Sequence, residues 1–183
     1  MRYSSEETAE KHERILDAAG MLFRSKGLSV NVRDIMAAAG LTHGAFYAHF
    51  DSKDALIAEI AERCVGETAA LVATARDAPD PLAALSNAYL SREHRDHAEA
   101  GCAVAALGAE LSRQTPESRE GYTGKIDAII DQIGALVDAD NPKAARKDAI
   151  RHYALAVGAL ILARTVSRPD LSDEILDAAR SGE

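Results

Sequence analysis

Apolar residues recur at intervals of three and four positions along most of the chain. The first stripe consists of Ile15, Ala18, Ala19, Leu22 and Phe23, and similar stripes cover residues 122–137 and 150–161. This spacing places apolar side chains on one face of an α-helix. The 183 residues include 37 alanines, and no segment alternates apolar and polar residues over the length of a strand. The sequence therefore predicts an all-α protein of about nine helices.

Four prolines mark the starts of later helices. Pro81, Pro116, Pro142 and Pro169 each follow a short polar stretch. Proline suits the first turn of a helix because the N–H that it lacks has no partner there. We expect long helices over residues 7–26, 53–76, 81–96, 100–113, 117–138, 143–166 and 171–180, with two short helices between 32 and 48.

The overall charge gives no reason to approach nucleic acid, because 29 acidic residues outnumber 21 basic ones and the net charge is −8. Residues 11–53 reverse this balance, with six basic and four acidic side chains. The longest apolar run, residues 153–163, is too short to cross a membrane, and the polar first residues are not a secretory signal. We expect a cytoplasmic protein without a membrane partner, whose two cysteines, Cys64 and Cys102, need form no disulfide.

Two glycines and two capping residues indicate a helix-turn-helix between residues 27 and 50. Gly27 can end the first helix because glycine adopts the left-handed conformation without strain, and Asn31 can then cap a second helix through its side chain. Gly40 closes that second helix, and Thr42 is the expected N-cap of a third helix of about six residues. A short helix after such a turn can enter the major groove of DNA with its first turn against base edges.

Four segments of this region resemble, in order, the amino-terminal signature of the TetR family of transcriptional regulators. They are Val32-Arg33-Asp34-Ile35, Ala38-Ala39-Gly40-Leu41-Thr42, Gly44-Ala45-Phe46-Tyr47-Ala48-His49-Phe50 and Ser52-Lys53-Asp54-Ala55-Leu56. The resemblance covers about residues 11–60, and the rest of the chain agrees with the family in helix number and spacing. It implies a helix-turn-helix DNA-binding domain over residues 1–52 and a larger helical effector-binding and dimerisation domain over residues 53–183.

The short third helix has a slim front and a polar first turn. Gly44 and Ala45 allow its backbone to sit deep in the groove, and Ala45 can contact a thymine methyl group. Thr42 and His43 are placed to reach base edges or neighbouring phosphates. Many family members carry lysine at the position of His43, and because histidine titrates near neutrality we expect DNA binding to depend on pH.

Aromatic and basic residues after this turn suit contacts to the DNA backbone. Tyr47 offers a hydroxyl, His49 an imidazole and Lys53 an ammonium, and the resemblance implies phosphate contacts at these matched positions. Phe46 and Phe50 are expected in the core of the small unit, where an aromatic cluster would also accommodate Tyr47 and His49. The candidate DNA-binding residues are Asn31, Arg33, Thr42, His43, Gly44, Ala45, Tyr47, His49 and Lys53.

The last two long helices are the expected dimer interface. One short recognition helix makes few contacts, so we expect a homodimer that reads two half-sites of a palindromic operator in double-stranded DNA. Residues 154–163 are apolar nearly all round and include Gly158, and a second stripe contains Leu171, Ile175, Leu176 and Ala179. Burial of both surfaces inside a monomer is the alternative.

Residues 81–138 are the expected sensing region for an unknown small-molecule effector. Polar or polarisable side chains on apolar stretches are the candidate ligand-binding residues, namely Asn87, Tyr89, Cys102, Tyr122 and Tyr153. Each of them has an alternative place in the core or on the surface. The alanine, leucine, valine and isoleucine around them favour a small apolar or aromatic effector.

These features together predict a ligand-responsive repressor, with an activator as the alternative and the helix from Lys53 to about Arg76 as the connecting lever. A redox or electrophile sensor is a second hypothesis, because Cys102 lies near an expected helix start. A metal-binding protein is a third, because His94 and His97 are three residues apart. No catalytic or phosphate-binding motif occurs, so we expect neither an enzyme, a bound metal nor a cofactor.

Overall fold

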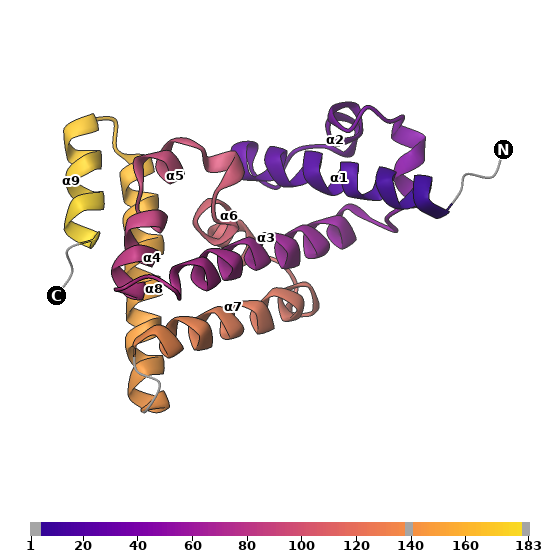
Figure 1. Ribbon diagram of the computed structural model, residues 1–183. Helices are drawn as coiled ribbons and strands as arrows, with labels where there is room; N and C mark the ends of the chain where they lie inside the picture. Colours follow the sequence, from indigo (N-terminus) through magenta and orange to yellow (C-terminus); the bar gives the residue numbers. More distant parts are fainter. Residues whose placement is uncertain (1–4, 138–140, 181–183) are drawn as a thin grey trace.

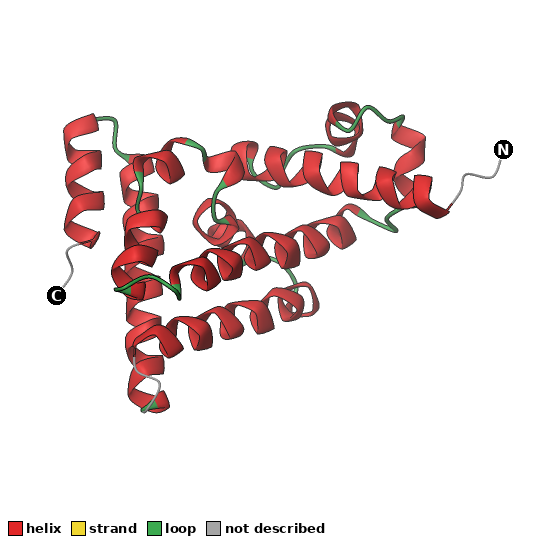
Figure 2. Cartoon of the chain, in the orientation of Figure 1, coloured by secondary structure: helices red, strands yellow, loops and turns green. Residues whose placement is uncertain are grey.

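The computed structural model describes residues 5–137 and 141–180, and these residues form helices joined by loops, without strands (Figure 2). The α-helices are α1 (Ser5–Lys26), α2 (Val32–Ala38), α3 (Lys53–Ala75), α4 (Pro81–Tyr89), α5 (Arg92–Asp96), α6 (Ala103–Leu111), α7 (Pro116–Val137), α8 (Pro142–Thr165) and α9 (Pro169–Arg180). Two 3₁₀-helices are η1 (His43–Ala48) and η2 (Ala98–Ala100). The predicted all-α class is confirmed.

The four prolines begin α4, α7, α8 and α9, as expected from their position in the sequence. Before α4, the Asp80 side chain accepts a hydrogen bond of 3.0 Å from the backbone N–H of Ala83. One predicted helix, over residues 81–96, is divided in the structure. The Ser91 hydroxyl accepts the backbone N–H of His94 at 3.1 Å and thereby starts α5 as a separate helix.

The helices α1, α2 and η1 form a small unit at one end of the molecule (Figure 1). Gly27 and Gly40 have φ angles of 82° and 66°, so both predicted glycine turns are confirmed. The core of this unit is formed by fully buried apolar side chains, including Ile15, Phe23, Ile35, Met36 and Phe46. Leu56 and Ile60 of α3 are also fully buried against it, which fixes the unit to the long third helix.

The remaining helices form a larger bundle whose central helices are α3, α7 and α8. The helix α3 runs from the amino-terminal unit into the bundle and packs along α7, α7 packs on α8, and α8 packs on α9 (Figure 1). Ile129, Leu160 and Leu176 are buried at these contacts. Within the described ranges, no helix is both long enough and apolar enough to span a membrane.

A second connection joins the two parts of the molecule besides α3. Arg24 near the end of α1 donates from Nε to the backbone carbonyl of Glu99 in η2, at 2.6 Å. The Glu110 carboxylate on α6 accepts the backbone N–H of Leu28 at 3.0 Å. The amino-terminal unit therefore packs directly against the segment that follows α5.

Candidate DNA interface and effector pocket

The first turn of η1 projects from the amino-terminal unit without support from neighbouring side chains. Thr42, His43 and Gly44 are exposed, and a Cβ atom added at Gly44 would meet nothing within 4 Å. Thr42 precedes the helix as expected, but its hydroxyl makes no capping hydrogen bond. Below this turn, Phe46 and Phe50 are 1% and 5% exposed and hold the helix on the core. The turn is thus an outward-facing edge, held on the core by Phe46 and Phe50, whose polar groups remain open to an external partner.

Tyr47 stands on the same exposed side of η1. Its side chain is 65% exposed, and its ring meets the buried Phe46 ring edge-on at a centroid distance of 5.3 Å. The His43 ring lies 6.2 Å from that of Tyr47, while Ala45 is partly buried. The structure therefore brings Thr42, His43 and Tyr47 together on one surface.

His49 occupies a more enclosed position than its neighbours in the sequence. Burial lowers the pKa of His49, and the nearby His12 and Lys11 lower it further. The His12 ring stacks on Phe50 at 4.7 Å and bonds to the Glu59 carboxylate at 2.8 Å. His49 therefore favours its neutral form at neutral pH.

Lys53 and Asn31 are engaged within the chain. The Lys53 ammonium donates to the Leu28 carbonyl at 2.5 Å and lies 5.9 Å from the centre of the Phe23 ring. Asn31 caps α2, as expected, by accepting the backbone N–H of Asp34 at 2.9 Å. Arg33, on the first turn of α2, is exposed. Lys53 thus joins the start of α3 to the turn after α1 instead of projecting freely toward solvent.

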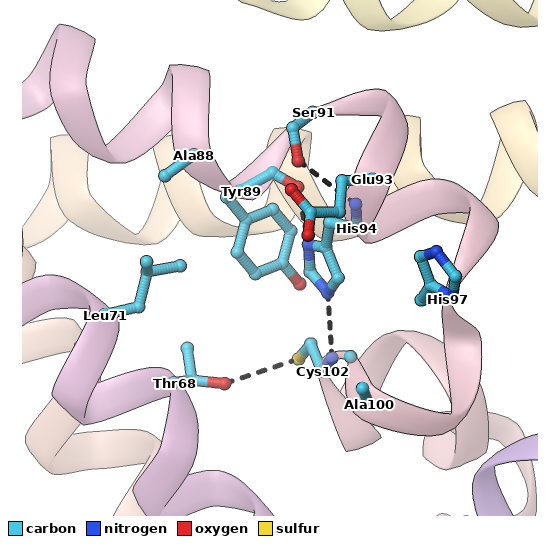
Figure 3. Close-up of a pocket in the computed structure, with 11 residues that line it drawn as sticks. Thr68, Leu71, Ala88, Tyr89, Ser91, Glu93, His94, His97, Ala100 and Cys102 are labelled. Atoms are coloured by element: carbon cyan, nitrogen blue, oxygen red, sulfur yellow. Dashed lines mark hydrogen bonds between the residues drawn. The ribbon is translucent and has the colours of Figure 1, made fainter.

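The largest cavity that contains predicted ligand-binding residues has a volume of about 560 Å³ and lies among α3, α4, α5 and the start of α6. Its lining combines apolar and polar side chains (Figure 3), namely Thr68, Leu71, Ala88, Tyr89, Ser91, Glu93, His94, His97, Ala100, Gly101 and Cys102. A small inner cavity of about 20 Å³ shares Thr68 and Tyr89 with this pocket and is also lined by Tyr153. Three of the five predicted residues therefore converge here.

The other two predicted ligand-binding residues lie elsewhere. Asn87 is exposed and lines neither cavity, because Ser86 and Tyr89 occupy the buried face of α4 and Asn87 points away from it. Tyr122 lines a separate pocket of about 490 Å³, and its hydroxyl donates to the Leu111 carbonyl at 2.8 Å. The register of α4 and this hydrogen bond remove both residues from the Tyr89 pocket.

His94 lines the pocket, whereas the sequence suggested it only as a metal ligand together with His97. Its Nδ1 lies 2.6 Å from the Tyr89 carbonyl, and its Nε2 lies 2.9 Å from the backbone nitrogen of Cys102. Because the carbonyl only accepts and the backbone N–H only donates, His94 is neutral with its proton on Nδ1. Burial lowers the pKa of His94, and the Arg164 charge acts in the same direction. His94 therefore fastens the end of α4 to the start of α6.

The structure does not support a metal site at His94 and His97. Both ring nitrogens of His94 are occupied, and His97 lies beyond the end of α5 with its Nδ1 3.2 Å from the Glu99 carboxylate. Across the described ranges, no group of three or more His, Cys, Asp or Glu side chains is placed to hold a metal ion. The metal-site hypothesis required one continuous helix through both histidines, but α5 ends at Asp96, before His97.

The outer face of α8 and α9 is unusually apolar. Leu155, Ile161 and Leu162 of α8 are 48%, 41% and 56% exposed. An open groove of about 450 Å³ contains two of them and is lined by Ala154, Leu155, Gly158, Ala159, Leu162, Ile175, Ala178 and Ala179. Leu176, in contrast, is fully buried within the chain. Internal packing thus covers one side of this helix pair and leaves the other uncovered.

The amino-terminal unit is similar in sequence to a known protein family. Residues 15–60 match the model of the family described as bacterial regulatory proteins, tetR family. Over 122 residues the chain is 30% identical to the HTH-type transcriptional repressor KstR2 of Rhodococcus jostii (strain RHA1), covering 64% of this chain and 58% of KstR2. Over 63 residues it is 43% identical to the HTH-type transcriptional regulator YvdT of Bacillus subtilis (strain 168), covering 34% of this chain and 32% of YvdT. The matches span less than two thirds of either relative.

Solved structures share the fold over nearly the whole chain. A TetR transcriptional regulator from Chloroflexus aurantiacus superposes with a TM-score of 0.79 at 23% identity, covering 96% of this chain and 95% of that one. The reduced form of Escherichia coli NemR gives a TM-score of 0.77 at 20% identity, covering 94% of each chain. The amino-terminal unit therefore matches the DNA-binding domain of the tetR family of bacterial regulatory proteins, and the chain as a whole has the fold of TetR-family regulators.

Proposed function

We propose that this protein is a ligand-responsive transcriptional repressor that binds a palindromic operator as a homodimer and is released from it by a small effector. The observation that carries the proposal is the first turn of η1, whose Thr42 and His43 project outward from a rigid aromatic core. Repression, in preference to activation, is supported by the name of the relative KstR2.

Contacts to DNA are assigned chiefly to side chains that are exposed and whose polar groups are not engaged within the chain. Thr42 and His43 face the base edges, Gly44 and Ala45 let the backbone approach, and Tyr47 binds a phosphate with its exposed hydroxyl. The exposed Arg33 and the neutral His49 reach the DNA backbone beside this helix. Asn31 and Lys53 contribute chiefly by holding α2 and the start of α3 in place. In this assignment, residues 1–52 form the DNA-binding domain.

The apolar face of α8 and α9 is proposed to bind the same face of a second copy. Two-fold pairing would cover Leu155 and Leu162, which no element within the described ranges buries. The pair of η1 helices would then enter successive major grooves about 34 Å apart. A Leu162→Asp substitution should shift the protein from dimer to monomer in sedimentation, whereas Ile150→Asp, on α8 but outside the groove, should not.

Effector binding is proposed to reach the DNA-binding domain through two connections. The helix α3 carries Thr68 and Leu71 in the pocket wall and continues to the amino-terminal unit. The segment from His97 to Cys102 lines the opposite wall, and Glu99 within it accepts the Arg24 side chain of α1. A shift of this wall therefore changes the support beneath α1. Arg24→Ala should weaken the effect of an effector on DNA binding more than it weakens DNA binding itself.

The direct test is selection of bound fragments from genomic DNA, beginning with the region upstream of the protein's own gene, at two salt concentrations. A recovered palindrome whose affinity falls steeply with salt supports a dimeric regulator. Recovery of single half-sites would contradict the dimer, and binding without sequence preference would contradict an operator-specific regulator.

Oxidation of Cys102 is a second candidate signal. The thiol lies in the pocket wall and accepts a hydrogen bond from the Thr68 hydroxyl at 3.6 Å. Hydrogen peroxide would convert the thiol to a sulfenic acid and release water. Loss of operator binding after peroxide treatment in the parent, retained binding in Cys102→Ala, and equal starting affinities would support this signal. Equal sensitivity of both proteins would contradict it.

A further inference from the structure

Three buried polar atoms without hydrogen-bond partners gather around Cys102. Within the described residues, four buried side-chain nitrogen or oxygen atoms lack a partner, and three of them are Tyr89 Oη, Tyr153 Oη and Arg164 Nη1. The Tyr89 and Tyr153 hydroxyls both lie beside the Cys102 thiol, which accepts hydrogen bonds only weakly. Arg164 interacts electrostatically with Cys102 and with Tyr89. Tyr89 is 3% exposed and Tyr153 is 8% exposed. Such groups are normally satisfied, so their concentration at one place points to a missing external partner.

Arg164 gives this cluster a charge. Its Nε donates to the Arg95 carbonyl at 3.0 Å and its Nη2 to the His94 carbonyl at 2.5 Å. No ion pair within the described ranges involves Arg164, although its guanidinium is half-buried. Burial lowers the pKa of Arg164, which reflects the cost of holding the charge there. The Glu99 and Asp96 carboxylates act on this charge from beyond ion-pair distance, so an anion bound directly to Arg164 would stabilise it further.

The guanidinium lies directly behind the pocket wall. A Cβ atom at Gly101, a lining residue, would stand 3.0 Å from Arg164 Nη2 and 2.6 Å from the His94 ring. Only a hydrogen at this position leaves room for both side chains. Gly101 thus allows the cation to approach the cavity that Tyr89 and Cys102 line.

Apart from the exposed Glu93 carboxylate, the remaining polar groups of the pocket are already paired. The Ser91 hydroxyl accepts a backbone N–H, both nitrogens of His94 are bonded, and the Thr68 hydroxyl donates to Cys102. The buried groups left open are therefore two phenolic hydroxyls and one guanidinium N–H, all of which can donate. A carboxylate is the complementary group, because its two oxygens only accept and carry the opposite charge.

We propose that the effector is a small carboxylic acid, whose carboxylate binds Tyr89, Tyr153 and Arg164 while its apolar body lies against Leu71 and Ala88 in the outer pocket. This inference deepens the proposed function and rests on it for the consequence of binding. Tyr89 lines both cavities, and in this proposal its ring moves to let the carboxylate reach Tyr153. The Tyr89 ring packs edge-on against His94 at 4.8 Å, so its movement is transmitted to the start of α6.

The test measures ligand binding to the full chain in the absence of DNA. Benzoate and octanoate are compared with benzamide and octanamide by titration calorimetry, because each amide matches its acid in size but lacks the charge. We expect at least one acid to bind about tenfold more tightly than its amide, in line with hydrogen bonds to a charged group. Equal affinity of acid and amide, or no binding by either acid, would overturn the proposal.

Tyrosine-to-phenylalanine variants locate the binding site. Tyr89→Phe and Tyr153→Phe should each weaken acid binding by about tenfold and leave the thermal unfolding midpoint nearly unchanged, because each hydroxyl gives up at most a weak contact with the Cys102 thiol. Tyr122→Phe is the matched control, since its hydroxyl is bonded to Leu111 and faces another pocket. Acid affinity that is the same in all three variants would contradict the site.

The calorimetric result does not depend on DNA binding, so the two proposals fail separately. Acid binding without a selected operator would leave the carboxylate site intact and contradict the repressor. An operator that is bound in the absence of ligand, together with acids that do not bind, would leave the regulator intact and overturn the carboxylate site. Release of the operator by the acid, with a higher concentration of its amide needed for the same release, supports both.

Discussion

The exposed turn of η1 and the wall of the Tyr89 pocket both contain polar groups without partners in the chain, but they differ in where those groups lie. Thr42 and His43 are solvated, so leaving them unpaired costs the fold little. Tyr89 Oη, Tyr153 Oη and Arg164 Nη1 are removed from water, so leaving each of these atoms unpaired destabilises the fold. Unpaired groups on the outside are open to any partner, whereas those inside demand one of particular chemistry and size.

The largest effect should come from a bulky side chain at Gly44, in the exposed first turn of η1. Gly44→Leu should reduce operator affinity by more than about 100-fold, toward that for unrelated DNA, because the added side chain holds the helix away from the bases. A Cβ atom at Gly44 meets nothing in the chain, so folding should be unaffected. Fluorescence anisotropy with operator DNA measures the change. Gly124→Leu is the matched control, since that glycine has equally open space on α7. Similar losses of operator affinity in both variants would contradict the proposal that the first turn of η1 contacts the DNA bases.

The next prediction distinguishes Tyr47, on the exposed side of η1, from Tyr89, in the pocket wall. Tyr47→Phe should weaken binding to operator and unrelated DNA alike by about tenfold, because a phosphate contact is lost without a change in sequence preference. Tyr89→Phe should leave DNA binding by the ligand-free protein unchanged. Anisotropy titrations of both variants against both duplexes test the distinction. A change in sequence preference in Tyr47→Phe would assign its hydroxyl to a base.

Much of the outer surface was predictable because its determinants are local. Gly27, Asn31 and Gly40 act through their own backbone or that of residues three positions away, so their turns and cap can be read from the sequence. The prolines define helix starts for the same reason. These signals sufficed to predict the fold class and the exposed edge at Thr42 and His43.

The inner surface depended on pairings that the sequence does not encode locally. Arg164 meets His94 across 70 positions of the chain, and Thr68 meets Cys102 across 34. Apolar patterning identified Tyr89 and Tyr153 as exceptional but could not exclude Asn87, two positions from Tyr89 on the opposite face of α4. Gly101 was the one local sign, because a glycine beside Cys102 leaves space for two distant side chains.

Lys53 lies between the two cases, because a phosphate contact was predicted for it, whereas its ammonium is bonded within the chain. Its ammonium donates to the Leu28 carbonyl, so Lys53→Ala should lower the free energy of unfolding by about 1.5 kcal/mol. The salt dependence of DNA binding should change by less than the slope of about 0.9 expected for one lost phosphate contact. Urea unfolding and anisotropy at several salt concentrations measure the two quantities. Unchanged stability with a full loss of slope would return Lys53 to the outer, DNA-binding group.

The smallest effect should come from the protonation of His94, the inner residue whose two bonds fix its tautomer. Its pKa is lowered in the folded protein, chiefly by burial, so the unfolded chain binds the additional proton more readily. The stability contributed by neutral His94 is therefore fully present above the unfolded value of about 6.5 and is lost as the pH falls through the lower folded pKa. Protonation places an N–H on Nε2 against the backbone N–H of Cys102 and opens the link between α4 and α6.

His94→Gln should be less stable at pH 7.5 and should lose less stability between pH 7.5 and pH 5.5 than the parent. His97→Gln, changed at the more exposed neighbour, should follow the parent's thermal midpoints at both pH values. Equal pH dependence in all three proteins would show that His94 does not hold this wall of the pocket through its neutral form.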